Sequence, residues 1–420
     1  MELYHTLTLL LVIAAAFGYI NHRFLRLPST IGLMILALVS SLFAIMLGWL
    51  GVPWVMSASQ LVRSIDFHKV LMDVMLSFLL FAGALHVDVR TLGKERWAVG
   101  AMAVVGTLLS TLLVATGMFY LLPLMGFDTP FIYCLLFGAL ISPTDPIAVM
   151  GILKQARISK NLEIKIVGES LFNDGIAVVV FISLYEIAVY GTDKATASFI
   201  GELFLREAAG GILLGVGLGY ATFWALRTID NYKVEVLITL ALVMGGTALA
   251  SAWHTSGPLA IVVAGLIVGD KGREKGMSDQ TREYLDKFWE MLDEILNAVL
   301  FVLIGLEMLV LDISNAVLLI GAAAIVLTLL SRFVSVALPL SFLRRYTDFN
   351  VATLRVLSWG GLRGGISVAL ALSLPATMPR DLIVGITYVV VVFSIIVQGL
   401  TIGPLVKKLG LSTEAEPGMH

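Results

Sequence analysis

Residues 129–152 read TPFIYCLLFGALISPTDPIAVMGI, and this stretch decides the fold. It is almost entirely apolar, yet Pro143 and Pro146 flank an acid, Asp145, close to its middle. Each proline removes an amide donor and pushes the preceding residue out of the right-handed helical region, so we do not expect a continuous helix there. Unpaired backbone at membrane depth is tolerated only where it lines a cavity or is buried in protein. The stretch therefore predicts an interrupted membrane helix whose break carries a function.

The composition of the whole chain supports a membrane setting for this stretch. Of 420 residues, 58% are hydrophobic and 14% are charged, whereas a soluble protein has roughly a quarter of its residues charged. With a mean hydropathy of +0.94, these figures exclude an ordinary cytosolic enzyme. The net charge of −2 provides no basic surface for nucleic acid, and the single cysteine, Cys134, excludes an intramolecular disulfide or a thiolate metal cluster.

Thirteen apolar blocks are separated by charged or Pro/Gly-rich gaps, and most reach the ~20 residues that a helix needs to span the hydrocarbon. We therefore predict an all-α polytopic membrane protein with about thirteen transmembrane helices. Residues 1–408 form a single transmembrane unit in this prediction, and residues 409–420 form a short cytoplasmic tail. The first block has no Lys or Arg before it, so we expect it to remain as a helix rather than to be cleaved as a signal peptide. The blocks are 4–20, 28–50, 70–88, 97–122, 129–152, 162–190, 199–227, 233–252, 256–269, 285–310, 313–342, 350–374 and 380–405.

The distribution of Lys and Arg predicts the orientation of the chain, because basic residues are retained on the cytoplasmic side of a membrane. Of the 28 Lys and Arg residues, 21 fall in or beside one alternate set of loops and the C-terminal tail, and only four fall in the other set. This asymmetry places the C-terminus in the cytoplasm. An odd number of spans then places the N-terminus outside.

The sixth block contains the polar run GESLFNDG at residues 168–175. Ser170 and Asp174 are four residues apart and share one helix face, whereas Glu169 and Asn173 share a second face rotated by about 100°. A carboxylate beside a hydroxyl suits a hard cation, and a carboxylate beside an amide suits contact with a partner helix. Charges inside a membrane cost ~2.5–3.5 kcal/mol each on insertion scales, so those that persist mark an ion or proton path.

The twelfth block is also interrupted, because residues 358–367 read SWGGLRGGIS. Four glycines around Arg363 weaken a helix in mid-membrane. A buried guanidinium without a carboxylate partner is costly, and the candidate partners are Glu169 and Asp145.

The two interrupted blocks, the fifth and the twelfth, are placed symmetrically in the sequence. If the chain is six helices, a connecting seventh and six more, they occupy the same position in each half, and the second half enters the membrane from the opposite face. This is the inverted repeat of secondary transporters, in which paired broken helices cross at the midplane with their half-helix dipoles facing the ion site.

These segments, SPTDP at 142–146, ESLFNDG at 169–175 and GLRGG at 361–365, resemble the signature segments of the NhaP/NHE-type sodium/proton exchangers of the monovalent cation:proton antiporter superfamily. The resemblance covers essentially the whole membrane region, with three motifs in the right order and spacing. It implies a thirteen-helix fold in which a dimerisation domain is interleaved with a mobile six-helix ion-binding core. It also implies a homodimer that works through an elevator-like movement.

By position, the resemblance implies that Asp174 binds the ion and carries the proton. Ser170, Thr144, Asp145 and Asn173 are the other ion- and proton-binding residues in this interpretation, with Asp174, Ser170 and Thr144 as the sodium ligands. Asn173 matches the asparagine that distinguishes this branch from relatives with two consecutive aspartates.

The resemblance also implies a salt bridge between Glu169 and Arg363 that holds the core helices together. Arg332 matches a recurrent basic position of the eleventh helix.

One segment departs from the family pattern. Some members carry an acid on the third helix near the cytoplasmic approach to the site, and Ala82 stands in its place here. His86 and Asp88 are the nearest polar substitutes along the chain.

The expected activity is Na⁺(Li⁺)/H⁺ antiport by alternating access, with electroneutral one-for-one exchange because Asn173 replaces a second acid. The expected partners are monovalent cations, protons, the lipid bilayer and a second copy of the chain, with no catalytic residue and no cofactor. The short tail favours a prokaryotic plasma (inner) membrane, where such exchange serves pH homeostasis. The alternatives are K⁺/H⁺ antiport on the same fold and an intramembrane hydrolase that uses Asp145 with Asp174, or Ser170.

Overall fold

Helices form the regular structure of the described chain. The structure, a computed structural model, describes residues 2–50, 67–145, 158–190, 197–311, 314–343 and 350–412, together with residues 150 and 153. Within these residues the β-type pairing is one isolated bridge between Ile158 and Ser412. Short π-helical segments, named η in the text, interrupt or extend several of the α-helices.

In chain order the elements are α1 (Glu2–Ile20), η1 (Asn21–Leu25), α2 (Ser29–Trp49), α4 (Phe67–Lys69), η2 (Val70–Met75), α5 (Leu76–Leu85), α6 (Val89–Ala101), η3 (Met102–Gly106), α7 (Thr107–Leu124), α8 (Phe131–Ile141), α10 (Lys160–Tyr190), α11 (Ala197–Arg227), α12 (Tyr232–Ala252), α13 (Gly257–Ile267), η5 (Val268–Gly276), α14 (Asp279–Glu307), α15 (Asn315–Phe342), α16 (Val351–Trp359), α17 (Gly365–Leu372), α18 (Arg380–Phe393), η6 (Ser394–Gln398) and α19 (Gly399–Lys408).

The all-α, multi-pass prediction is confirmed, since each of the thirteen apolar blocks contains helix among its described residues. Nine helical stretches among the described residues are long and apolar enough to cross a membrane. The count of thirteen spans and the inverted repeat stay predictions.

Both predicted helix breaks are present. α8 ends at Ile141, two residues before Pro143, and the backbone from Ser142 to Asp145 is not helical. The remainder of the predicted fifth span, including Pro146, lies largely outside the described residues. In the twelfth block, α16 ends at Trp359 and α17 begins at Gly365, so the glycine-rich run separates two short helices.

The helices that carry the two breaks belong to one packed group. α7 packs against α8, α10 against α6 and α8, and α15 against α7, α16 and α18, while α17 contacts both α8 and α18. A large buried apolar cluster, which includes side chains from α8, α10, α15, α17 and α18, fills the space between them. The two broken segments therefore lie inside protein, as non-helical backbone at membrane depth requires.

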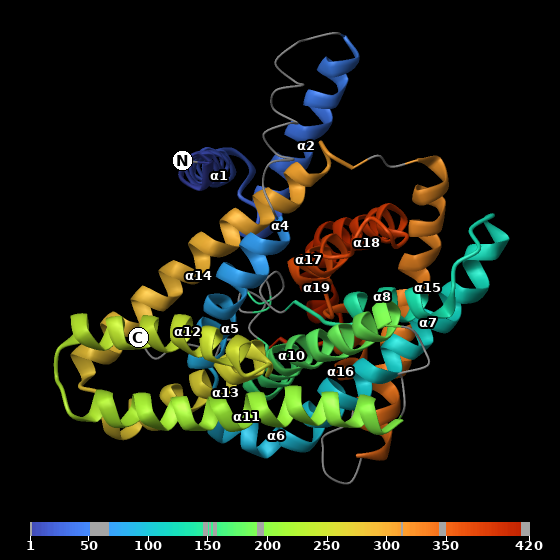
Figure 1. The fold of residues 1–420 in the computed structure, drawn as a ribbon. Coiled ribbons are helices and arrows are strands. Elements are labelled where there is room, and N and C mark those ends of the chain that lie inside the picture. Colours follow the sequence, from blue (N-terminus) through green and yellow to red (C-terminus); the bar gives the residue numbers. More distant parts are fainter. Residues whose placement is uncertain are drawn as a thin grey trace.

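A second group of helices packs beside the first. α11 lies along α13, α12 contacts both of them, α13 packs on α5, and the long α14 reaches from α12 at one end to α1 and α2 at the other (Figure 1). Helix α10 contacts α11, α13 and α5 as well as its own group. The helix that carries the polar run thus lies at the boundary between the two groups.

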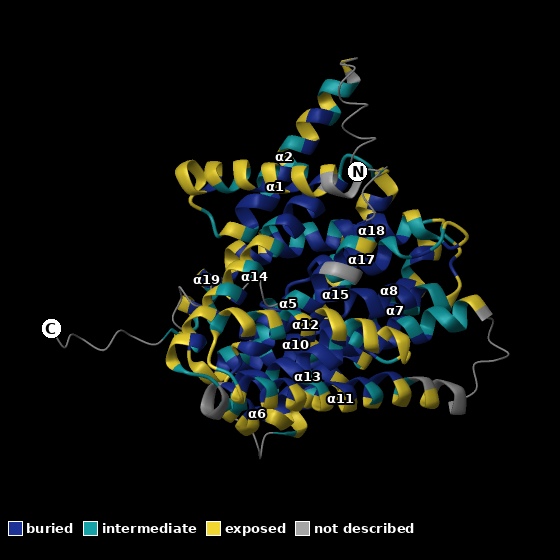
Figure 2. Cartoon of the chain, turned by 60° about the vertical axis from the view of Figure 1, so that its left-hand side comes forward, coloured by how far each residue is buried: buried dark blue, intermediate teal, exposed yellow. Residues whose placement is uncertain are grey.

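The outer faces of the bundle are apolar rather than charged. Figure 2 shows exposed residues along α1, α11 and α12, while the helices around α8, α10 and α17 are mostly buried. Large apolar side chains such as Leu213, Trp224, Leu237 and Met244 are more than 60% exposed. An apolar surface of this extent fits contact with lipid.

Candidate ion-binding site

The two helix breaks meet each other in the interior. The amide of Asp145 donates a hydrogen bond to the carbonyl of Leu362 over 2.8 Å, which joins the breaks backbone to backbone. Arg363 reaches across from the second break, and its Nη1 donates to the carbonyls of Ser142 and of Pro143, the latter over 2.9 Å. The backbone from Ser142 to Asp145 is not helical, and Pro146 has no amide hydrogen to donate to the Ser142 carbonyl, so the guanidinium supplies donors to this break.

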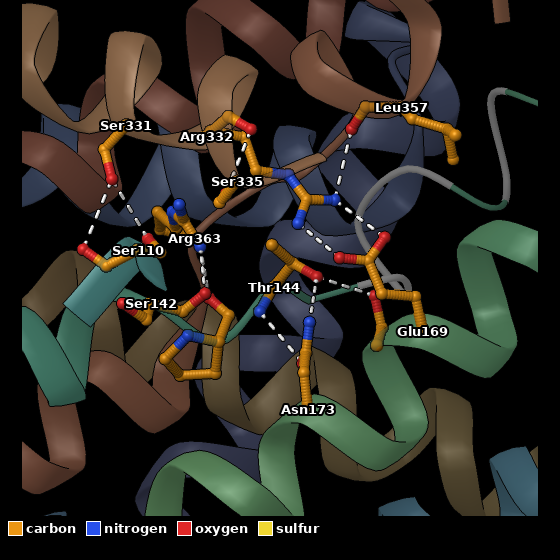
Figure 3. Close-up of polar contacts among 12 residues, drawn as sticks. Ser110, Ser142, Thr144, Glu169, Asn173, Ser331, Arg332, Ser335, Leu357 and Arg363 are labelled. Carbon is orange, nitrogen blue, oxygen red and sulfur yellow. Dashed lines mark hydrogen bonds and ion pairs between the residues drawn. The ribbon is translucent and has the colours of Figure 1, made fainter. Parts of the chain in front are cut away.

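Helix α10 holds the first break through two polar side chains (Figure 3). Asn173 engages Thr144 twice, because its Nδ2 donates to Thr144 Oγ1 over 2.9 Å and its Oδ1 accepts from the Thr144 amide over 3.3 Å. The hydroxyls of Thr144 and Ser170 lie 2.9 Å apart and share a hydrogen bond. All three side chains are at most 2% exposed, so the structure brings together the predicted site residues Thr144, Ser170 and Asn173.

The two acids of the predicted site lie close to this network. Asp174 is on α10, one turn after Ser170, and its side chain is 6% exposed. Asp145 follows Thr144 in the first break, within electrostatic range of Asp174. Hydroxyl and carboxylate oxygens thus gather where the breaks cross α10, which is the ligand chemistry that a hard monovalent cation requires.

Glu169 forms an ion pair with Arg332 instead of the expected Arg363. Both η-nitrogens of Arg332, on α15, donate to the carboxylate of Glu169, and the Nη2 bond is 2.8 Å. Nη2 also donates to the carbonyl of Leu357 on α16 over 3.2 Å (Figure 3). The predicted Glu169–Arg363 pair is therefore replaced, because the open carbonyls of the first break occupy Arg363. Arg332 was recognisable in the sequence as a charge inside an apolar block.

Glycines at the second break allow this close packing. A Cβ on Gly361 would meet the guanidinium of Arg332, and a Cβ on Gly364 would meet the carboxylate of Asp145. Both positions therefore require the smallest residue for steric reasons.

A π-helical segment anchors the second break from behind. Ser394, at the start of η6, accepts the amide of Arg363 over 2.8 Å and donates to Gln398 over 2.7 Å. Gln398 in turn donates to the carbonyl of Trp359 over 2.8 Å. The extra residue of a π-turn is common at functional sites, and here it directs two polar side chains at one break.

A small cavity lies between the two arginines. It has a volume of about 10 Å³ and is lined in part by Thr328, Arg332, Arg363 and Gln398. Thr328 Oγ1, Arg332 Nε and Arg363 Nη2 are buried there without a hydrogen-bond partner in the described structure. The cavity can hold one water molecule, which would accept from the two guanidinium nitrogens and donate to the hydroxyl of Thr328.

The polar residues of the third helix are not part of this cluster. Ala82 is buried, and its carbonyl oxygen lies 2.8 Å from Nδ1 of His86, whose Nε2 is 3.8 Å from Asp286. Asp88 caps the N-terminus of α6, and hydrogen bonds from the Thr91 side chain and backbone lower the pKa of its carboxyl group. Neither residue replaces the family's acid at the ion site.

One buried ion pair was missed by the sequence reasoning. Lys165 on α10 lies 3.3 Å from Glu95 on α6, and both side chains are at most 10% exposed. The sequence places Lys165 close to the end of an apolar block and so groups it with the cytoplasmic loop charges, whereas the structure buries it against Glu95. Lys165 lies one turn before Glu169 on α10, and this position was the feature of the sequence that could have indicated its burial.

The described geometry defines a class of protein. A polytopic helical bundle with two helix breaks that meet beside buried acids and hydroxyls is the arrangement of a secondary ion transporter. The family model for the transmembrane sodium/hydrogen exchanger matches residues 11–408, and the chain belongs to that family.

Individual relatives and a solved structure agree with this assignment. The chain is 52% identical to the Na⁺/H⁺ antiporter NhaP of Pseudomonas aeruginosa, with 96% of each chain covered. It is 36% identical to the Na⁺/H⁺ antiporter NhaH of Halobacillus dabanensis, over 93% of this chain and 94% of that one. The structure of the sodium proton antiporter MjNhaP1 from Methanocaldococcus jannaschii has the same fold, with a TM-score of 0.77, 21% identity, and coverage of 98% of this chain and 100% of that one.

Proposed function

We propose that the protein exchanges Na⁺ or Li⁺ for H⁺ across a prokaryotic plasma membrane, one for one and without net charge movement. The observation that carries the proposal is the buried cluster of Thr144, Ser170 and Asp174 where the two helix breaks cross α10. The names of the relatives support the same exchange reaction.

In this mechanism Asp174 binds either one cation or one proton. With a cation, the hydroxyls of Ser170 and Thr144 complete the oxygen ligand set, and Asp145 adds negative charge nearby. When a proton is bound instead, Asp174 is neutral and needs neither the two hydroxyls nor Asp145. Either occupant neutralises the carboxylate, so the site can cross the membrane; empty and ionised, it is held back by the cost of moving a bare charge through hydrocarbon.

Asn173 explains the charge balance of the proposed cycle. Its amide is engaged on both sides with Thr144, so it fixes the break and adds no titrating group beside Asp174. Each half-cycle then moves the same charge. An electrogenic cycle would gain ~2.3 kcal/mol per net charge per 100 mV.

The movement that we propose is an elevator-like shift of the group that carries the breaks, which contains α6, α7, α8, α10 and α15–α19, against the remaining helices in each protomer of a homodimer. The orientation proposed from the basic residues has the N-terminus outside and the C-terminus, with residues 409–420 as a short tail, in the cytoplasm. The protein acts in this proposal as a transporter rather than an enzyme and contributes to pH homeostasis.

The test is proton flux in proteoliposomes, driven by Na⁺, Li⁺ or K⁺ and compared across pH. Na⁺ and Li⁺ should drive flux in the wild-type protein, and Asp174→Asn should abolish it. Glu163→Gln, on the first turn of the same helix, should retain it. If only K⁺ drives flux, the exchanged cation is K⁺ rather than Na⁺ or Li⁺. An active Asp174→Asn variant would overturn the mechanism.

Charge balance is tested separately by clamping the membrane potential with a potassium ionophore. The wild-type Na⁺-driven rate should remain nearly unchanged when the potential is clamped at zero. A rate that follows the imposed potential would contradict electroneutral exchange.

A further inference from the structure

A groove on the outside of the bundle is not used by the proposed transport cycle. It has a volume of about 550 Å³ and lies between α15, α16 and α19. Its walls are mostly apolar and include Leu329, Phe333, Pro404 and Leu405. Phe333 is 47% exposed although it lies in the middle of the long apolar helix α15.

The polar groups of the groove are arranged along its length. Trp359 Nε1 donates to Thr401 Oγ1 over 2.9 Å and ties α16 to α19. The two helices run antiparallel, because Arg363, beyond the end of α16, contacts Ser394, before the start of α19. Arg355, one turn before Trp359, and Lys408, about two turns after Thr401, therefore lie toward the same end of the groove. Both side chains are exposed, and none of the described residues that line the groove is acidic.

We propose that this groove binds one anionic phospholipid. The acyl chains lie along Leu329, Phe333 and Leu405, and the phosphate group meets Arg355 and Lys408. Basic pockets between membrane helices near the water interface bind anionic head groups in this way. Ser358 also lines the groove, and its buried hydroxyl has no hydrogen-bond partner in the described structure.

The position of the groove gives the lipid a role in transport. α16 runs from Arg355 directly into the second helix break after Trp359, and α15 carries Arg332, which holds Glu169. A lipid that bridges α16 and α19 therefore fastens the helix that leads into the ion site. The bound anionic lipid thus regulates transport through this group of helices, in addition to being part of the surrounding bilayer.

Binding is measured on the detergent-purified protein by native mass spectrometry and thermal shift, with phosphatidylglycerol, phosphatidylcholine and inorganic phosphate as separate probes. We expect tighter binding of phosphatidylglycerol than of phosphatidylcholine. At ~1 kcal/mol per basic residue, Arg355→Gln or Lys408→Gln should weaken the binding of phosphatidylglycerol about fivefold, and the double variant about thirtyfold. Lys407→Gln removes a neighbouring exposed charge that does not line the groove, and it should bind like the wild-type protein.

A groove-filling variant, Leu405→Trp, separates a lipid from a free anion. It keeps both basic residues and should still lose phosphatidylglycerol. If inorganic phosphate binds as tightly as phosphatidylglycerol and Leu405→Trp leaves phosphatidylglycerol binding intact, the groove is not a lipid site. Equal binding of both phospholipids, or wild-type binding by the double variant, would also overturn the proposal.

The effect on transport is measured in proteoliposomes with and without phosphatidylglycerol. Na⁺-driven proton flux of the wild-type protein should rise with phosphatidylglycerol, and flux of the Arg355→Gln/Lys408→Gln variant should not respond. This arm rests on the proposed exchange activity, whereas the binding arm does not, so failure of one can be told from failure of the other. A response retained by the double variant would remove the regulatory role.

Discussion

The pairing of Glu169 with Arg332 can be tested by a double-mutant cycle. The carboxylate is 1% exposed and the guanidinium side chain 7%, and two charge-assisted hydrogen bonds join them. Removing one partner from a buried ion pair costs ~3–5 kcal/mol, because the other charge stays buried without compensation. Arg332→Gln and Glu169→Gln should each lower the unfolding free energy by about this amount.

The double variant, Glu169→Gln/Arg332→Gln, decides the interpretation. With both charges gone, its loss should be smaller than the sum of the two single losses by ~1.5–3 kcal/mol, which is the range for hydrogen bonds to charged groups and lies within the range for residues in one network. The unfolding free energy is measured in mixed micelles from tryptophan fluorescence. Expression and monodispersity of each variant in detergent provide the control for misfolding.

A second cycle uses Arg363 in place of Arg332. Arg363 donates to backbone carbonyls of the first break, so Arg363→Gln should be destabilising by itself yet couple to Glu169→Gln more weakly than Arg332→Gln does. The reasoning is refuted if the Arg363 cycle has the large coupling energy and the Arg332 cycle has the small one.

Three further changes test separate features. Gly364→Ala would place a Cβ against the carboxylate of Asp145 in the other break, so Na⁺-driven proton flux should fall to background. Gly217→Ala, where a Cβ meets nothing within 4 Å, should retain flux. Full flux for Gly364→Ala would show that the breaks are not in contact. Asp88→Ala removes the cap of α6 and should cost about 0.5–2 kcal/mol of unfolding free energy at neutral pH. Because hydrogen bonds lower the folded pKa of Asp88, this contribution should be complete above the ordinary carboxyl pKa and be lost as pH falls through the lowered value, so a pH-independent difference would contradict the cap. Thr328→Val should remove a hydrogen-bonding hydroxyl from the small cavity and abolish the water density there in a high-resolution map. Thr387→Val is the control, because its hydroxyl donates to a carbonyl of its own helix, and this variant should leave the water density in place.

The helix breaks could be predicted from the sequence because their causes are local. Pro143 acts on its own amide and on the residue before it, and the glycines around Arg363 lower helix propensity at their own positions. The structure accordingly ends α8 at Ile141 and α16 at Trp359. The prediction that the face of α10 with Glu169 and Asn173 contacts neighbouring elements agrees with the structure, since both side chains bind other segments.

The partners of the buried charges could not be predicted in the same way. Arg332 and Arg363 look equivalent along the chain, because each is an arginine inside an apolar block. The choice between them depends on where the carbonyls of the first break lie relative to α10, and three segments far apart in sequence set that position. Lys165 illustrates the same limit, because its burial depends on α6 packing against the first turns of α10.

The interior charges can be separated by what each one binds. Arg363 satisfies backbone that the prolines have left open, and the pair of Glu169 with Arg332 fixes α10 to α15 and α16. Charges held in this way contribute to the shape of the site but are not available to exchange an ion for a proton. In the proposed cycle Asp174, which directly follows Asn173 and lies one turn after Ser170 on α10, is the carboxylate left to bind a cation or a proton. The proposed competition at Asp174 then takes place beside arginine contacts that hold the neighbouring segments in position.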